Sequence, residues 1–377
     1  MKMRIFTPGP TPLPEEVKIS QVREIIHHRT SEFSKVFAEV QDGLKYIFQS
    51  QNEVLILTAS GTGAMEATVV NLLSPHDKVL VIQGGKFGER WTEINRTFGL
   101  EVVVLKVEWG KVAGAEEIGD ILKQNPEIKA VFAQLVETST GVVYDIKSIA
   151  EVVKETSAVL IVDAISGLGA EPLPQDQWAV DVVIGGSQKA LMVPPGLAFV
   201  SLSEKARELM ESSTLPCYYW DFKKAIKSLL TGQTPYTPAV SLICALRESL
   251  KIIRKEGQEK IIRRHSLLAQ ATRAAANSLG LRVFGFPSSN VVTAMVIPEE
   301  IGANRLKKLM WEKYGVLTAG GQAHLAGKII RIAHLGWMDN LDILGAISAL
   351  EMSLGQLGYS VKLGSGIKAA EEILSKE

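Results

Sequence analysis

Lys189 is the side chain in this sequence that is best placed for covalent chemistry. It ends a small polar turn, GGSQK, which directly follows the apolar run VDVVI at 180–184. Such a run predicts a buried strand, so the amine lies at a strand end, where burial favours its uncharged form. An uncharged lysine amine forms a Schiff base with an aldehyde. Taken alone, the pattern also fits a solvated surface lysine.

A carboxylate follows a second apolar run. Residues 159–162 predict another buried strand, and Asp163 comes next. Ligands of open α/β sheets bind outside the carboxyl ends of the strands, where this carboxylate would lie. Pyridoxal 5'-phosphate (PLP) needs such a group, because a carboxylate paired with the pyridine nitrogen keeps that nitrogen protonated and lets the ring accept electrons. The alternative is an ordinary helix N-cap or turn aspartate.

A third apolar run, at 54–57, precedes the small polar turn TASGTG and an alanine-containing helix start. Free amides at a helix N-terminus bind phosphate. The turn is not a Walker loop, because no Lys-Ser or Lys-Thr follows the glycines, and it lacks the third glycine of a dinucleotide fingerprint. An ordinary strand-to-helix turn would also explain it alone. A phosphate cup, a carboxylate and an amine, each at the end of a different predicted strand, together indicate a PLP site.

The order and spacing of these motifs resemble the class V aminotransferases of PLP fold type I, most closely the serine-pyruvate and alanine-glyoxylate aminotransferase group. The resemblance covers nearly the whole chain. It is carried by TPGPT at 7–11, HRTSEF at 28–33, SGTG at 60–63, ETSTG at 137–141, VD at 162–163, SQK at 187–189 and RIAHLG at 331–336.

The resemblance implies a role for each central residue. Lys189 would carry the cofactor and shuttle the proton, and Asp163 would pair with the pyridine nitrogen. Gln188 would help to hold the phosphate. Three backbone amides would complete the phosphate site, those of Thr62, Gly63 and Ala64.

The resemblance also implies contacts to the cofactor ring. Thr138 or Ser139 would hydrogen-bond the ring hydroxyl, and the sequence does not separate the two. Phe87 falls where the family stacks an aromatic ring on the pyridine. Many relatives have tryptophan there, so Phe87 is a departure, although a phenyl ring can also stack. Without the resemblance, core packing is the simpler interpretation of Phe87.

Substrate and subunit contacts are implied in the same way. Arg331 would clamp the substrate carboxylate through its planar guanidinium, with a surface strand arginine as the alternative. Gly9 and Pro10 of the N-terminal arm would line the substrate pocket. Thr234 and Thr237 would reach the phosphate bound by the neighbouring subunit, so the resemblance implies a homodimer with shared active sites.

The implied activity is PLP-dependent transamination. An amino group would move from a small L-amino acid, alanine or serine, to a 2-oxo acid, glyoxylate or pyruvate, by a ping-pong mechanism. Aspartate and phosphoserine aminotransferases share the same chemical core, and no second arginine can be assigned to a distal acid. A noncatalytic PLP-binding or regulatory protein is the alternative of another class, but the intact Lys189, Asp163 and Arg331 argue against it. A cysteine desulfurase would need a cysteine around 315–328, where the chain has none.

The composition agrees with an enzyme of this kind. The chain has 377 residues, of which 46% are hydrophobic and 22% charged, enough for two domains. Its 41 basic and 41 acidic residues give zero formal net charge, so nucleic acid and membrane surfaces are not expected partners. Cys217 and Cys244 lack metal-site spacing and fit a reducing cytoplasm, and no catalytic metal is expected. No signal core or run of transmembrane length is present.

The predicted fold class is α/β, with a mainly parallel seven-stranded sheet in the large domain. Strand-length apolar runs recur at 54–58, 79–82, 101–105, 130–133, 159–162, 180–184 and 197–202. Most are separated by stretches long enough for helices, which is typical of parallel sheets. The resemblance makes the last of these strands antiparallel to the rest.

We expect an N-terminal arm at 1–18, a large PLP-binding domain at 19–260 and a small α+β domain at 261–377. A long helix from Val240 to about Leu279 would connect the two domains, because few helix breakers occur there. The small domain is expected to contain strands at 291–297 and 328–332 and helices at about 303–314 and 339–356.

Overall fold

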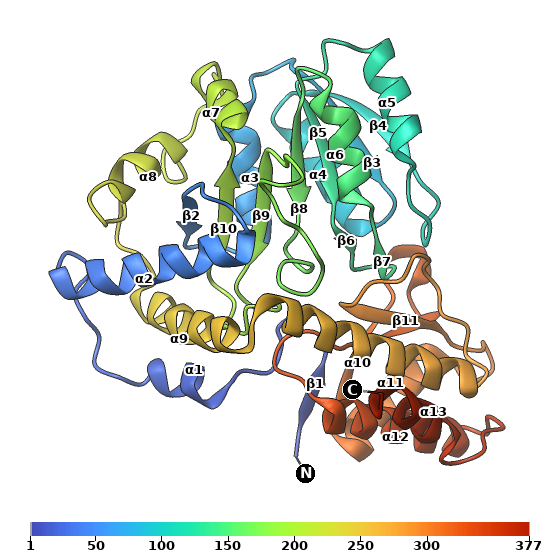
Figure 1. Cartoon of the computed structure of the whole chain (residues 1–377). Coiled ribbons are helices and arrows are strands. Elements are labelled where there is room, and N and C mark those ends of the chain that lie inside the picture. The colour runs from blue at the N-terminus through green and yellow to red at the C-terminus, as the bar shows by residue number, and fades with distance from the viewer. Residues whose placement is uncertain (1, 377) are drawn as a thin grey trace.

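The seven apolar segments form one sheet in the computed structural model, which describes residues 2–376 (Figure 1). In spatial order its strands are β2 (Val54–Leu57), β10 (Ala198–Leu202), β9 (Val182–Gly186), β8 (Val159–Asp163), β5 (Ala130–Gln134), β3 (Lys78–Gln83) and β4 (Glu101–Lys106). Strand β10 runs antiparallel to both β2 and β9, whereas the other pairings are parallel. The expected sheet and its antiparallel member are confirmed.

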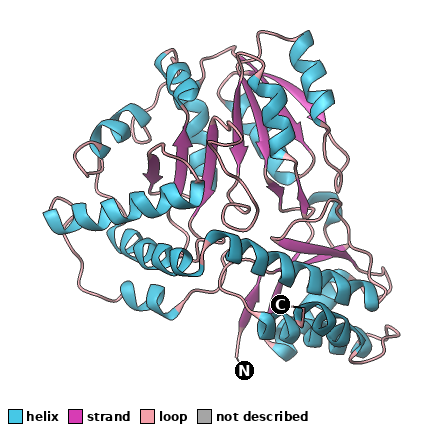
Figure 2. Cartoon of the chain, viewed as in Figure 1, coloured by secondary structure: helices cyan, strands magenta, loops and turns pink. Residues whose placement is uncertain are grey.

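Helices enclose this sheet on both faces (Figure 2). Successive strand residues point to opposite faces, so Val79 and Val81 of β3 belong to one core, while Leu80 and Ile82 belong to the other. The first face is covered by α3 (Gly61–Leu72), α4 (Lys86–Thr97), α7 (Glu204–Glu211) and α8 (Phe222–Leu229). The second is covered by α2 (Ser31–Phe48), α5 (Ala115–Gln124), α6 (Ile146–Lys154) and α9 (Val240–Glu256).

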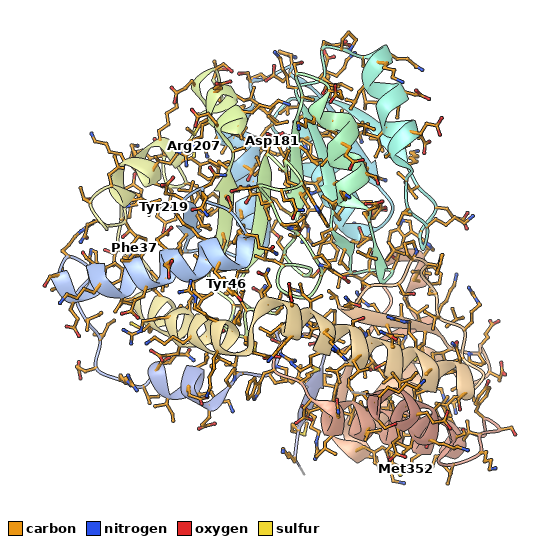
Figure 3. All side chains as sticks on the ribbon, in the orientation of Figure 1. Phe37, Tyr46, Asp181, Arg207, Tyr219 and Met352 are labelled. Carbon is orange, nitrogen blue, oxygen red and sulfur yellow. The ribbon has the colours of Figure 1, made fainter. Side chains whose placement is uncertain are left out.

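Helix α2 illustrates how local sequence fixes an element. It begins after Thr30, whose hydroxyl accepts a hydrogen bond from the amide of Phe33 at 3.3 Å and so caps the helix. Tyr46, which Figure 3 labels on α2, lies beside α9, where the Arg254 guanidinium is 5.2 Å from its ring centroid. Arg254 also pairs with Asp42 at 2.6 Å. These contacts fix α2 against α9.

The prediction of a single helix from Val240 to about Leu279 is wrong. The structure has two helices, α9 and α10 (Gln258–Ser278), separated by Gly257. Gly257 has a φ of +90°, a backbone conformation that glycine adopts without the steric penalty of a side chain. One glycine in an otherwise helical pattern therefore ends the first helix.

A second sheet, of four strands, forms the core of the C-terminal part. Its order is β1 (Arg4–Phe6), β12 (Val316–Gly320), β13 (Ile329–Ala333) and β11 (Val292–Val296). The helices of this part are α10, α11 (Ala303–Tyr314), α12 (Asn340–Gln356) and α13 (Ser365–Leu374). The predicted strands and helices of this part are therefore found, within a few residues of their expected ends. The structure adds β1 and β12.

The smaller elements are α1 (Glu15–Ser20), β6 (Val136–Glu137), β7 (Val142–Val143) and a short 3₁₀ helix (Ala323–Leu325). Helices α10 to α13 share an apolar core with the second sheet, separate from the two cores of the first. On this basis we propose the division into 1–18, 19–260 and 261–377, with β1 of the arm joined to the small sheet. Among residues 2–376, no helix has both the length and the apolar character needed to cross a membrane.

Candidate active site

A cavity of about 250 Å³ lies where strands of the large sheet end. Ligands of α/β sheets bind at this edge because the carboxyl ends of parallel strands meet there. The cavity is lined by Ser60, Gly61, Thr62, Phe87, Arg90, Thr138, Asp163, Ile165, Ser166, Gln188 and Lys189. The predicted amine, carboxylate and phosphate turn are therefore brought together.

Lys189 lies in the turn that follows β9. Its Nζ donates a hydrogen bond to the carbonyl oxygen of Pro8 in the N-terminal arm. Burial lowers the pKa of Lys189 to about 8. The negative charge of Asp163 acts in the opposite direction and raises this pKa, whereas the positive charge of Arg331 lowers it further. About one amine in ten is therefore uncharged at pH 7, the form that a nucleophile requires.

Asp163 is the last residue of β8 and is 6% exposed. Burial raises the pKa of this carboxyl to about 6, and a hydrogen bond from the Ile165 amide to Oδ1, 2.9 Å long, acts in the opposite direction. The carboxyl is therefore largely ionised above pH 6. Its Oδ2 is left to accept a hydrogen bond from a ligand.

The phosphate cup is the start of α3. The amides of Gly63 and Ala64 donate to the carbonyl oxygen of Ser60, at 2.9 and 3.3 Å, so they are already engaged. The amides of Gly61 and Thr62 begin the helix, where amides have no partner within the helix, and both residues line the cavity. The Ser60 hydroxyl makes no capping hydrogen bond. Of the three amides expected to bind phosphate, only that of Thr62 faces the cavity.

Gln188 is the neutral side chain at the same end of the cavity. Its Oε1 is buried without a hydrogen-bond partner among the described residues. A buried polar atom without a partner costs free energy, which a ligand contact would remove. The amine, the carboxylate and the free helix amides together fit PLP.

Thr138 and Ser139 differ in what they contact. The Thr138 Oγ1 lies 2.7 Å from the Ser166 Oγ, and both residues line the cavity. Ser139 is fully buried, and its hydroxyl donates to the Glu137 carboxylate at 2.5 Å. The structure therefore brings Thr138 to the cavity and directs Ser139 elsewhere.

Phe87 is positioned by a buried carboxylate. It is the second residue of α4, and its ring lines the cavity. The fully buried Glu137 accepts hydrogen bonds from the amides of Phe87 and Gly88, each 3.1 Å long. Burial raises the pKa of Glu137, while hydrogen bonds, led by that from Ser139, lower it. A carboxylate at this helix N-terminus complements the helix dipole and fixes the start of α4.

Arg331 approaches from the small sheet. It lies in β13, is 6% exposed, and donates from Nε to the Gly320 carbonyl at 2.9 Å and from Nη1 to the Thr138 carbonyl at 2.7 Å. Burial lowers its pKa to about 10, so it stays charged at neutral pH. These two bonds hold the guanidinium beside Thr138, which lines the cavity, although Arg331 itself is not one of the lining residues.

The N-terminal arm lies against the lysine. Gly9 has a φ of +124°, and a Cβ added to it would lie 2.5 Å from the Lys189 Nζ. Thr11 fixes this approach, because its amide donates to the Gln188 carbonyl at 3.2 Å and its hydroxyl to the Lys189 carbonyl at 2.9 Å. Pro10 is exposed.

Thr234 and Thr237 are absent from the lining of this cavity. The Thr234 hydroxyl donates to the Tyr236 carbonyl at 2.7 Å, and Thr237 is exposed. Arg29, from the HRTSEF motif, holds the segment by donating to the Thr234 carbonyl at 2.7 Å. Within one chain these residues therefore do not reach the cofactor site, whereas Thr62 and Gln188, among the predicted ligands of the phosphate, line the cavity.

Four polar side chains at or beside the cavity were not assigned a role from sequence: Ser60, Arg90, Glu137 and Ser166. Arg90 follows Phe87 by three positions, a spacing that puts both on one helix face, and this was the available signal. Ser60 is of a type that precedes helices. Glu137 is a charged residue before two predicted ligands. Ser166 had no signal in the sequence.

A larger groove, of about 1360 Å³, lies elsewhere on the surface. It is lined mainly by α10, α2 and the segments 49–51 and 172–178, including Arg263, Tyr46 and Trp178, and shares no residue with the cavity at the strand ends. Among residues 2–376, no group of three or more His, Cys, Asp or Glu side chains is placed to hold a metal ion.

Comparison with known proteins gives a family match over most of the chain. The family described as aminotransferase class-V matches residues 16–334. The ureidoglycine-glyoxylate aminotransferase of Bacillus subtilis has a similar solved structure, with a TM-score of 0.94 and 28% identity over 100% of this chain and 99% of that one. The expected PLP fold type I is confirmed.

This chain also aligns with curated relatives over nearly their full lengths. The small subunit of a soluble hydrogenase from Synechococcus is 45% identical over 99% of both chains. The serine-glyoxylate aminotransferase of Methylorubrum extorquens is 36% identical, and the L-aspartate-glyoxylate aminotransferase of Paracoccus denitrificans is 35% identical. Each of these two alignments covers 98% of this chain and 95% of the relative.

Proposed function

We propose, from the premise that this chain belongs to the class-V aminotransferase family and is a PLP-dependent transaminase, that it moves the amino group of L-serine or L-alanine to glyoxylate. Pyruvate is the alternative acceptor. Three of the similar proteins are named for glyoxylate as the acceptor, although their amino donors differ. The Synechococcus relative is named for a hydrogenase, and the residues described above give no separate argument for that activity.

The observation that carries the proposal is the meeting of three groups at one cavity, with a fourth beside it. Lys189, Asp163 and the start of α3 line the cavity, and Arg331 donates to the backbone carbonyl of Thr138, which also lines it. A transaminase needs an amine, a partner for the ring nitrogen, a phosphate site and a clamp for the substrate carboxylate. We propose one of these residues or segments for each task.

PLP, when bound, supplies an aldehyde that captures amines and a ring that accepts electrons. We propose that Lys189 attaches the cofactor, is displaced by the amino acid, and then removes and returns a proton at the substrate α-carbon. Asp163 holds the proton on the pyridine nitrogen. Its position at the end of β8, with Oδ1 bound to the Ile165 amide, would orient Oδ2 for that contact.

Recognition of the substrate is assigned to Arg331, with the free part of its guanidinium facing the α-carboxylate. Gly9 and Pro10 would form the wall contributed by the arm. Arg90, which lines the cavity, donates to the Thr62 hydroxyl in the phosphate cup. It therefore lies beside the expected phosphate and not beside a substrate side chain, which favours serine or alanine over aspartate and phosphoserine as donor.

We propose Thr138 as the partner of the ring hydroxyl and Phe87 as the stacking ring, because both line the cavity. We also propose that two chains share each site. Thr234 and Thr237 would then contact the phosphate held by the partner subunit, which agrees with their absence from the cavity of their own chain.

The test is a pair of half-reactions. The protein loaded with PLP is mixed with one amino acid at a time, without acceptor, and the released keto acid is counted. A ping-pong transaminase releases at most one equivalent per site, and addition of glyoxylate restores turnover. Serine or alanine should react with the highest kcat/KM, while Lys189→Ala should release none. A preference for aspartate or phosphoserine, or release of keto acid by Lys189→Ala, would contradict the proposal.

A further inference from the structure

Arg90 joins the two segments that surround the phosphate end of the cavity. It lies one turn after Phe87 in α4, is half-buried, and lines the cavity. Its Nη1 donates to the Thr62 hydroxyl at 3.1 Å, and its Cζ lies 4.9 Å from the centroid of the Phe87 ring. The guanidinium is therefore fixed between the start of α3 and the ring expected to stack on the cofactor.

No carboxylate neutralises this arginine. Glu89 and Glu93 of the same helix pair with Lys86, at 3.0 and 3.6 Å, and no carboxylate oxygen among residues 2–376 lies within 4.0 Å of an Arg90 nitrogen. A half-buried guanidinium retains its charge, and Arg is suited to anions that accept two parallel hydrogen bonds. A guanidinium that faces a cavity without a carboxylate partner is thus available to an anionic ligand.

Around the start of α3, the described lining residues other than Arg90 present neutral donors. They are the Ser60 hydroxyl, the free amides of Gly61 and Thr62, and Gln188. A phosphate monoester carries a charge of about −1.5 to −2 at pH 7. The helix N-terminus supplies only about half an elementary charge. Arg90, bonded to Thr62 at this helix start, supplies a full charge from the same chain.

We propose that Arg90 is a phosphate-binding residue of the cofactor site, and that its cation-π contact couples the phosphate to the position of Phe87. The phosphate and the stacking ring would then be held by one side chain. The charge of Arg90 also acts on the reacting groups. It lowers the pKa of Asp163, against the larger effect of burial, and it lowers the pKa of Lys189, in the same direction as burial.

The experiment compares two ligands that differ only by the phosphate and carry no aldehyde. Pyridoxine 5'-phosphate and pyridoxine are titrated into the full-length apoprotein, and each Kd is measured by calorimetry. Arg90→Met should raise the Kd of pyridoxine 5'-phosphate about 10- to 100-fold, the size of one charge-assisted hydrogen bond. It should change the Kd of pyridoxine less than 3-fold. Arg90→Lys, which keeps the charge without the fork, should lie between Arg90→Met and the wild type.

Lys86→Met is the matched control. It removes a cation from the same helix, but one that is already paired with Glu89 and Glu93, so both Kd values should stay within 2-fold of the wild type. Equal weakening of both ligands by Arg90→Met would show that Arg90 acts only through Phe87 and would overturn the proposal. An unchanged Kd for pyridoxine 5'-phosphate would overturn it as well.

A variant that does not fold is recognised by its thermal unfolding without ligand. In that case the wild-type protein is titrated at 0.05 and 0.5 M salt. A charged contact predicts that only the phosphate ligand weakens, whereas equal salt dependence of both ligands would contradict it.

Discussion

Gly9→Ala tests how the arm controls the reactive lysine. A Cβ on Gly9 would lie 2.5 Å from the Lys189 Nζ, 2.6 Å from Cδ and 2.7 Å from Cε. These are distances that non-bonded carbon and nitrogen atoms do not reach, so the lysine must move or the arm must lift. We expect either movement to break the hydrogen bond from Lys189 to the Pro8 carbonyl and to increase the exposure of the amine to water.

The size of the effect follows from the pKa of Lys189. With the pKa lowered to about 8 by burial, about one amine in ten is uncharged at pH 7. An exposed lysine with the ordinary pKa of 10.5 has about one in 3000 uncharged. Full exposure would therefore reduce the reactive fraction about 300-fold, and partial exposure by less. We expect a 10- to 300-fold slower attachment of PLP at pH 7.

The assay mixes apoprotein with PLP and follows the visible absorption of the lysine-bound cofactor. Borohydride reduction and mass spectrometry then verify that Lys189 carries it. Raising the pH to 10 should restore much of the lost rate, because the exposed amine loses its proton there. A normal rate at pH 7 would refute the argument.

Gly99→Ala is the matched control. Gly99 also has a positive φ, +77°, but an added Cβ would meet nothing within 4 Å. Both variants should lose about 1–3 kcal/mol of unfolding free energy through backbone strain. Only Gly9→Ala should slow PLP attachment. Equal slowing by Gly99→Ala would mean that strain, and not contact with Lys189, causes the effect.

Three further predictions concern the cofactor, the substrate and the partner subunit. Asp163→Asn should stabilise the apoprotein by about 1–3 kcal/mol at pH 7.5 in urea unfolding while abolishing transamination. The reason is that the carboxyl pKa, raised from 3.8 to about 6, makes the native state lose stability as the pH rises through that window; equal stability at pH 7.5 would contradict it. Arg331→Ala should raise KM for all amino acids together by about 100-fold or more, the size of two charged hydrogen bonds, whereas a loss confined to one substrate would indicate a side-chain reader. Thr237→Ala should raise the PLP Kd about 3- to 10-fold through one lost hydrogen bond, with the nearby exposed Thr231→Ala as the neutral control; an unchanged Kd would count against the shared site.

Much of the fold could be predicted because burial leaves a clear mark on the sequence. The strands of the large sheet are covered on both faces, so each appears as a continuous apolar run. The break at Gly257 could not be predicted, since a single glycine is compatible with a helix interior and its positive φ comes from the tertiary structure. Strand β1 has only three residues, too few to show an alternating pattern.

The residues of the candidate site likewise fall into those that the sequence could predict and those that it could not. Lys189 and Asp163 were found because their strands and turns are local features of the sequence. Of the three amides predicted to bind phosphate, those of Gly63 and Ala64 donate to the carbonyl of Ser60 in this structure. Which amides remain free depends on where the helix starts, and a boundary read from sequence is uncertain by a few residues. Arg90 was not predicted because the direction of its side chain depends on where α4 starts.

The central claim is that Lys189 binds PLP and uses it to exchange amino groups. The most direct measurement is a visible spectrum of the purified protein with PLP, followed by L-alanine, L-serine, L-aspartate and L-phosphoserine added one at a time. The account predicts an absorption band of the lysine-bound cofactor that is lost on addition of serine or alanine and restored by glyoxylate. A protein that shows no such band after PLP is added, or whose band forms equally in Lys189→Ala, would contradict it.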